Sequence, residues 1–268
     1  MLLAITIWII TLISAILFAG RVWWFPESAS AHGAQLDTQF VYTLIITGVI
    51  FVLAQTALGY FIVRYRERPG QQATYSHGND KMEIIWTTAT AVLFFVMVLL
   101  GFRVWIDMYV QAATPDSIQI EVTGQQFAWN IRYPGSDGQF GSTSPELIND
   151  SGGNPLGLDP NDPTGGDDIV LPTMAVPVDR PIQLLLRSKD VTHSFSVREL
   201  RVKQDTLPGM VIPLKFVATK LGKYEIACTE LCGLGHHRMR SYIDVLSEED
   251  YTEWLRLNGS GNNPNSRY

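Results

Sequence analysis

The sequence of 268 residues lacks the short motifs that mark an independent catalytic domain. It has no G-x-G-x-x-G or G-x-x-x-x-G-K-[ST] run for binding nucleotides, and no Ser/His/Asp motif. Its only two cysteines are Cys228 and Cys232, so a C-x2-C-H run for covalent haem attachment does not occur. Basic residues are also few, with 20 Lys+Arg against 26 Asp+Glu and a net charge of −6, which disfavours nucleic acid as a partner. We therefore expect no catalytic residue in this chain itself.

Charged side chains are absent from three long stretches in the first part of the chain. Residues 2–20, 40–63 and 84–102 contain none. A helix needs about 20 apolar residues to cross a bilayer, and uncharged runs of this length argue against buried core helices. The sequence predicts transmembrane helices at about 2–20, 38–64 and 83–108, within a membrane region of residues 1–115.

The first apolar stretch has a second interpretation as a cleaved signal peptide. Ala29-Ser30-Ala31 resembles a small-residue cleavage site. However, no Lys or Arg precedes the stretch, and the cleavage site lies far beyond its end. We therefore favour a retained helix.

The loop between the second and third predicted helices sets the orientation. It carries Arg64, Arg66, Arg68 and Lys81, and basic loops stay in the cytoplasm. Everything after the third helix then lies outside, so we predict a multi-pass protein of the bacterial inner (plasma) membrane with a periplasmic C-terminal domain. Trp23 and Trp24 stand where aromatic residues anchor a helix at the membrane interface.

The exported part of the chain has the pattern of an all-β domain. Residues 117–133 alternate and are rich in strand formers, and residues 134–168 have the Gly, Asp, Pro, Ser and Asn content of a long surface loop. Many short strands imply a Greek-key β-sandwich over residues 116–248, followed at 249–268 by the start of a C-terminal helix and a polar tail. Further strands are expected at 169–171, 182–186, 193–197, 211–219, 223–227 and 240–245.

One loop gathers soft metal donors in the pattern C-x-E-x-C-x3-H-x2-M, from Cys228 to Met239. Thiolate, imidazole and thioether suit copper rather than magnesium or calcium. A mononuclear blue-copper site needs one Cys, so the second thiolate argues for a two-copper centre. The second imidazole it requires is offered upstream by His193, in a β-type run. The alternatives are a disulfide and a structural zinc site, which wants four N/S ligands and gives a Met no role.

This loop, with Asp190-Val191-Thr192-His193-Ser194-Phe195 before it, resembles the binuclear copper (CuA) site of subunit II of haem-copper oxidases. The resemblance implies two copper ions bridged by Cys228 and Cys232. It also implies four further ligands. His193 and His236 would each bind one copper, Met239 would be a weak ligand of one copper, and the Glu230 carbonyl would be a weak ligand of the other. The resemblance gives His237 no role. In the family the Glu230 side chain also reaches toward a magnesium shared with subunit I.

Other segments extend the resemblance over roughly residues 38–257. Gly124-Gln125-Gln126-Phe127-Ala128-Trp129 is similar to the aromatic segment of the family, in which many members have a Trp at the position of Phe127 as their electron-entry residue. Because Phe127 replaces this Trp, the identity of the electron donor stays open. Trp129 matches the family. Asp205-Thr206-Leu207-Pro208-Gly209 matches a segment facing subunit I. Glu83 is either an acid at a helix N-terminus or, as in the family, a residue near the entry of a proton-uptake pathway.

The resemblance implies a membrane-α plus all-β fold with a cupredoxin-like domain, and a function as the electron-entry subunit of a respiratory terminal oxidase. Electrons would come from cytochrome c or a small copper protein. They would pass to haem in subunit I for oxygen reduction coupled to proton translocation. The expected partners are subunit I, other oxidase subunits and the lipid bilayer. The alternatives are a subunit of a membrane nitric oxide reductase and a membrane-anchored copper-delivery protein.

Overall fold

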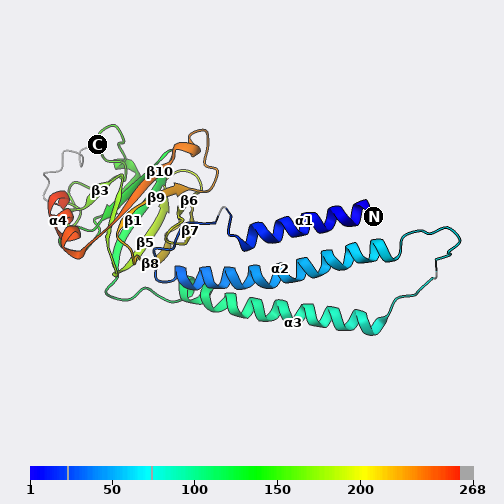
Figure 1. Cartoon of the computed structure of the whole chain (residues 1–268). Helices are drawn as coiled ribbons and strands as arrows, with labels where there is room; N and C mark the ends of the chain where they lie inside the picture. The colour runs from blue at the N-terminus through cyan, green and yellow to red at the C-terminus, as the bar shows by residue number, and fades with distance from the viewer. Residues whose placement is uncertain (23, 74, 260–268) are drawn as a thin grey trace. The chain divides into compact units, whose positions relative to one another are not determined.

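The computed structural model describes residues 1–22, 24–73 and 75–259, and it divides into two compact units (Figure 1). The first unit consists of Met1–Phe25 and Gln35–Val104. The second consists of Pro26–Ala34 and the chain from Trp105 onward. Trp23 and residues 260–268 of the predicted polar tail lie outside the described residues.

The first unit contains three helices, α1 (Leu2–Ala19), α2 (Gly33–Arg64) and α3 (Asp80–Trp105), each long and apolar enough to cross a membrane. At 1.5 Å per residue they meet the length that the hydrocarbon core demands. No residue of α3 is buried, as expected of a helix whose solvent is lipid. Asn79 Oδ1 accepts a hydrogen bond from the Met82 backbone N–H at 3.2 Å and caps α3. A short π-helical segment η1 (Ile106–Val110) follows α3.

A close approach joins α1 to α2. The Trp8 indole Nε1 donates to the Thr56 carbonyl at 3.4 Å. A Cβ on Gly59 would lie 2.3 Å from the same indole nitrogen. Gly59 therefore leaves the space that the indole ring fills, as small residues do where membrane helices pack.

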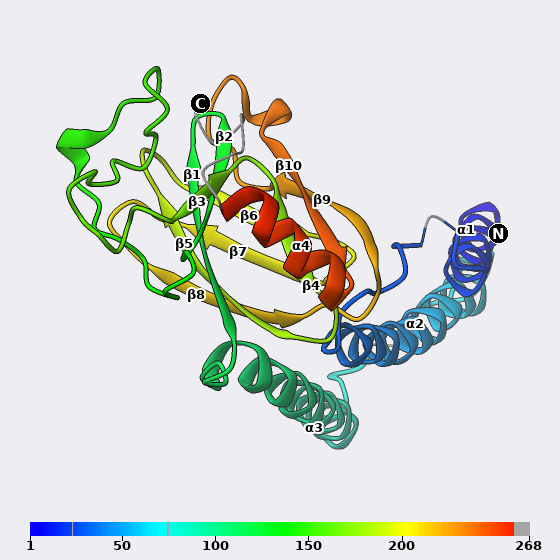
Figure 2. The same cartoon turned by 90° about the vertical axis from the view of Figure 1, so that its left-hand side faces the viewer.

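The second unit is a sandwich of two five-stranded sheets (Figure 2). One sheet has the order β3-β2-β1-β5-β8 and the other β4-β10-β9-β6-β7. The strands are β1 (Ile118–Gln125), β2 (Ala128–Tyr133), β3 (Ile169–Leu171), β4 (Met174–Pro177), β5 (Pro181–Ser188), β6 (His193–Val197), β7 (Val202–Thr206), β8 (Ile212–Val217), β9 (Gly222–Cys228) and β10 (Arg240–Leu246).

Apolar side chains of the two sheets form one core between them. Ile120 and Leu184 of the first sheet are fully buried, as are Phe195, Ile226 and Ile243 of the second. Burial alternates along β5, so every second side chain faces the core. The predicted β-sandwich is confirmed.

Two strands, β4 and β7, were not predicted. β4 has four residues and lies between Pro172 and a terminal Pro177, so its sequence has the signals of a turn. β7 reads Val-Lys-Gln-Asp-Thr and lacks the apolar alternation of a half-buried strand. It forms because it pairs along its whole length with β6.

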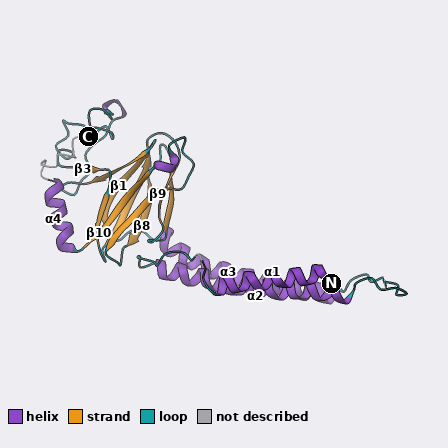
Figure 3. Ribbon diagram, turned by 45° about the horizontal axis from the view of Figure 1, so that its top comes forward, coloured by secondary structure: helices purple, strands orange, loops and turns teal. Residues whose placement is uncertain are grey.

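The predicted long loop between β2 and β3 contains the short 3-10 turn η2 (Pro145–Leu147) (Figure 3) and two isolated β-bridges. A buried ion pair fixes its end to the sheet: Arg132 Nε donates to Asp168 Oδ2 at 2.9 Å, and both side chains are almost fully buried. Arg132 also lies 3.6 Å from the buried Glu121 carboxylate. At the far side of the loop, Lys189 Nζ pairs with Asp150 at 2.8 Å.

Helix α4 (Glu248–Gly259) closes one end of the sandwich (Figure 2). Ser247 Oγ accepts from the Asp250 N–H at 3.1 Å and caps the helix. The Trp254 ring packs edge-on against the buried Tyr133 ring at 5.0 Å and stacks with Tyr251 at 6.0 Å.

Residues 26–34, which the sequence places within the membrane region, belong to the β-sandwich unit. The Ala29 N–H donates to the Glu199 carbonyl at 2.7 Å, and Ser30 Oγ donates to the Leu200 carbonyl at 2.7 Å. Sequence patterns did not indicate this contact, because it joins segments about 170 residues apart.

Candidate metal centre

The loop that carries the soft donors closes the hairpin between β9 and β10. Cys228 is the last residue of β9, and its N–H donates to the Met239 carbonyl at 3.1 Å. β6 lies beside β9, with Phe195 opposite Cys228, and the Thr229 N–H donates to the Ser194 carbonyl at 3.1 Å. Strand pairing therefore brings the first residue of β6, His193, to the loop.

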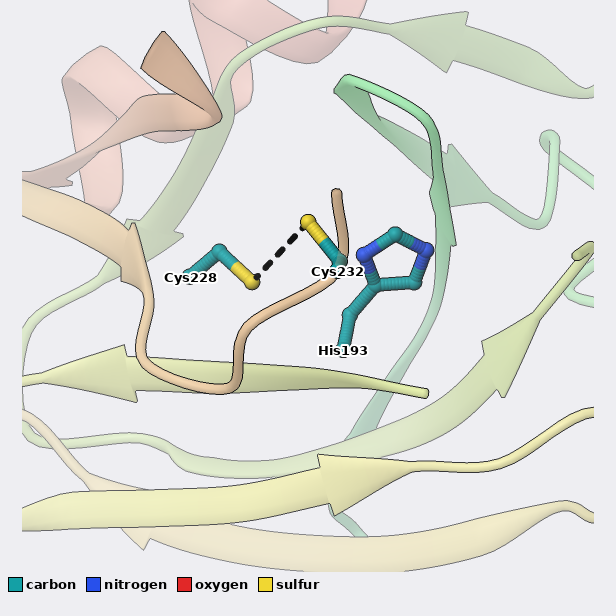
Figure 4. Close-up of side chains that lie close together, drawn as sticks. All are labelled: His193, Cys228 and Cys232. Carbon is teal, nitrogen blue, oxygen red and sulfur yellow. Dashed lines mark hydrogen bonds between the residues drawn. The ribbon is translucent and has the colours of Figure 1, made fainter. Parts of the chain in front are cut away.

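His193, Cys228 and Cys232 converge on one point (Figure 4). Their potential ligand atoms all lie within 4.8 Å of one another, and all three residues are buried. The two sulfur atoms are 3.9 Å apart. A disulfide requires about 2.05 Å, so the cysteines are free thiols in this structure. Burial, and next the adjacent Cys228 thiol, raise the pKa of the Cys232 thiol to about 11.

Three more predicted donors surround the sulfurs. His236 Nδ1 lies 3.6 Å and Met239 Sδ 3.7 Å from Cys232 Sγ. The Glu230 carbonyl oxygen lies 3.2 Å from Cys228 Sγ. The structure thus gathers two sulfurs, two imidazoles, a thioether and a carbonyl at one place.

His193 is oriented by Asp190. Its Nε2 lies 2.8 Å from Asp190 Oδ1, while its Nδ1 is buried and has no hydrogen-bond partner among the described residues. Burial alone would raise the pKa of Asp190. Hydrogen bonds from the Gln126 N–H, from His193 and from the Val191 N–H outweigh it and hold that pKa below its ordinary value. An imidazole with one nitrogen bound to a carboxylate and the other buried without a partner is the arrangement of a metal ligand. The donor set fits copper.

Gly124 permits the close packing behind His193. A Cβ on Gly124 would lie 2.9 Å from His193 Cδ2 and 3.1 Å from Trp129 Cζ3. The buried Trp129 ring lies edge-on to His193 at 6.0 Å. Trp129 is therefore part of the wall behind the imidazole.

The turn between β1 and β2 covers the loop from its other side. Phe127 is 38% exposed, and its ring contacts Gly235, where a Cβ would lie 2.4 Å from Phe127 Cδ2. Gln126 Nε2 donates to the Cys232 carbonyl at 2.6 Å. Sequence reasoning assigned no role to Gln126 or to Asp190. The available signal was that Gln126 lies within the family-like segment 124–129 and Asp190 within the segment 190–195 that contains His193.

The side chains of two predicted residues lie outside the donor cluster. Glu83 lies in the first turn of α3, in the first unit, and its N–H donates to the Asn79 carbonyl at 3.0 Å. Glu230 has an exposed side chain, and no carboxylate contact is present among the described residues. The loop also exposes Leu231 and Leu234, the latter almost completely.

Comparison with known proteins places both units. Residues 16–104 match the family model of the cytochrome c oxidase subunit II transmembrane domain, and residues 158–246 match that of its periplasmic domain. The chain is 36% identical over 235 residues to the alternative cytochrome c oxidase subunit 2 of Bradyrhizobium diazoefficiens, covering 87% of this chain and 83% of the relative. It is 30% identical over 254 residues to cytochrome c oxidase subunit 2 of a Synechocystis species, covering 87% and 75%.

The solved periplasmic domain of subunit II of cytochrome oxidase (CoxB) from Bradyrhizobium japonicum is also similar to this chain. It is 27% identical with a TM-score of 0.40, covering 55% of this chain and 96% of that one.

Proposed function

This chain belongs to the cytochrome c oxidase subunit II family, and on that premise we propose that its loop and His193 hold a binuclear copper centre. As a subunit II, the chain is the electron-entry subunit of a membrane-bound oxidoreductase complex, with its β-sandwich in the periplasm. The observation that carries the copper proposal is the convergence of two free thiols on a buried imidazole nitrogen that lacks a partner.

The proposed ligands follow from the donor atoms. Cys228 and Cys232 would hold the copper pair through their thiolates, which are soft donors on one short loop. His193 binds through Nδ1, since its Nε2 is engaged by Asp190. His236, the Met239 thioether and the Glu230 carbonyl, whose donor atoms each lie 3.2 to 3.7 Å from one of the two sulfurs, would complete the ligand set.

When bound, the copper pair supplies a one-electron site between an external donor and the partner subunit. The chain's own contribution is rigidity. Strand pairing fixes Cys228 and His193, Asp190 fixes the imidazole ring, and Trp129 fills the space behind it. A loop held in this way moves little between redox states, so reorganisation is small.

We propose cytochrome c or a small copper protein as the electron donor. The net charge of −6 falls entirely on residues 111–268, which favours a basic carrier. Phe127 is partly exposed and contacts the loop at Gly235, and the buried Trp129 ring on β2 lies against His193. Both are therefore proposed to lie on the entry route.

We propose subunit I as the partner that receives the electron, with other oxidase subunits around it. Asp205–Gly209 and the exposed Glu230 carboxylate would face it, and Glu230 is the candidate ligand for a shared magnesium. Glu83, at the cytoplasmic start of α3, is the candidate for proton uptake. In this proposal the three long helices lie in the membrane, and the β-sandwich unit, which includes residues 26–34, holds the copper.

The experiment is oxygen consumption by the purified complex with a reduced external donor. Cys228→Ser removes one bridging sulfur, and we expect turnover to be lost. Thr229→Ser, an exposed neighbour on the same loop, is the matched control and should keep turnover. Equal turnover in the Cys228→Ser complex would refute the proposed centre.

A further inference from the structure

One residue of the β1–β2 turn is bonded to both halves of the donor cluster. The Gln126 backbone N–H donates to Asp190 Oδ2 at 2.7 Å, and the other oxygen of that carboxylate lies 2.8 Å from His193 Nε2. The Gln126 side-chain amide donates to the Cys232 carbonyl at 2.6 Å. Gln126 therefore connects the imidazole side of the cluster to the cysteine loop.

The Cys232 end of the loop has little other support. Its backbone has no other hydrogen-bond partner among the described residues. Cys228, in contrast, is held within β9 and by its bond to the Met239 carbonyl. The position of the Cys232 backbone thus depends on Gln126, while its buried sulfur lies beside His236 Nδ1 and Met239 Sδ.

We infer that Gln126 is a positioning residue that holds Cys232 apart from Cys228 and so opposes disulfide formation when the loop carries no copper. The inference rests on the proposed function, because a disulfide would remove both thiolates from metal binding. The sulfurs are 3.9 Å apart and must reach about 2.05 Å to bond. In this inference, closing that gap displaces the Cys232 backbone and breaks its 2.6 Å hydrogen bond from Gln126.

The reaction that the Gln126 hydrogen bond opposes is a thiol–disulfide exchange with a small disulfide such as oxidised glutathione. One cysteine attacks it and releases one glutathione thiol, and the second cysteine displaces the other. The two cysteine thiols lose two electrons and two protons to form the Cys228–Cys232 bond. The oxidant takes them up as two glutathione thiols.

The test uses the full-length chain in detergent after chelation of copper, exposed to oxidised glutathione. Loss of free thiols is followed by maleimide labelling and mass spectrometry. Gln126→Met removes the amide at similar size, and Gln126→Glu keeps the shape but replaces the donor by a carboxylate that cannot donate when ionised. Loss of one hydrogen bond should accelerate disulfide formation roughly fivefold to tenfold in both variants.

Two control variants separate restraint from general weakening. Gln125→Met alters the preceding residue, whose Oε1 accepts from Asn130 and Lys189; among the described residues its side chain has no hydrogen bond to the loop. Tyr133→Phe removes the buried hydroxyl that donates to the Ala175 carbonyl at 3.0 Å, and it lowers stability away from the loop. Both controls should oxidise at the wild-type rate.

Each outcome decides the inference. Wild-type rates in both Gln126 variants would overturn it, and so would a Tyr133→Phe protein that oxidises as fast as they do. If Gln126→Glu fails to fold, Gln126→Met alone gives the result. The oxidation assay contains no copper, so its result does not depend on whether the chain forms a two-copper centre. Faster oxidation of the Gln126 variants would support the inference even if copper loading of the wild-type chain refuted the proposed function.

Discussion

Removal of the Asp190 carboxylate should weaken copper binding by releasing His193. The 2.8 Å contact between Asp190 and His193 Nε2 fixes the imidazole ring so that Nδ1 faces the sulfurs. Asp190→Ala removes this contact. A hydrogen bond to a charged group contributes roughly 1.5–3 kcal/mol, or about tenfold to a hundredfold in affinity. Because the Asp190 side chain is 31% exposed, solvent screening places the expected loss nearer tenfold. Asp190→Asn keeps an acceptor oxygen and should lose less.

The assay is competition for copper against a chelator of known affinity, with the full-length chain in detergent. Asp137→Ala is the control, because it removes the same charge from the same domain. Among the described residues, its carboxylate accepts a hydrogen bond only from the nearby Gln139 N–H. Copper affinity equal to wild type in a folded Asp190→Ala protein would refute the view that this carboxylate orients the imidazole.

Three further predictions concern the stability of the β-sandwich. Arg132→Met should lower the free energy of unfolding in urea by about 3–5 kcal/mol, because it leaves the buried Asp168 carboxylate without its cation; a loss near zero would contradict this. Gly235→Ala should cost about 1–3 kcal/mol by pressing a methyl group into the Phe127 ring, and the cost should vanish in a Phe127→Ala background. Burial, more than the nearby Glu248, raises the pKa of Tyr251 to about 12, so its neutral form favours folding. Stability should therefore hold below pH 10 and fall by about 2–3 kcal/mol between pH 10 and 12. Urea unfolding of Tyr251→Phe should show a smaller alkaline loss than wild type, and equal losses would contradict the assignment.

The membrane helices and most of the strands were predictable because their signals are local. An uncharged run such as residues 2–20 has no soluble alternative of that length, and the alternation in residues 117–133 specifies strands without knowledge of their partners. β4 and β7 were missed for the opposite reason. Their residues form strands because β10 and β6 offer free edges, which no local pattern records.

The donor cluster shows the same division. Five of its six donors lie within twelve consecutive residues, so spacing and donor chemistry indicated them together. The contacts that hold them could not be read in this way. Gln126 reaches Cys232 across 106 positions and Asp190 across 64, and only the pairing of the strands brings these segments side by side.

The buried pair of Arg132 and Asp168 also escaped sequence reading. Asp168 is one of several acids in a polar loop, and composition gave it the role of a solvated side chain. The fold instead buries its side chain against Arg132. Composition describes the average residue of a loop. It cannot identify Asp168 as buried, because that burial depends on the pairing of β2 with β3.

Electron paramagnetic resonance of the full-length chain loaded with copper tests the central claim most directly. The account predicts an unpaired electron shared equally by two copper ions, because Cys228 and Cys232 would hold both. The spectrum of a single copper ion would contradict it. So would a chain that takes up no copper and carries a disulfide between the two cysteines.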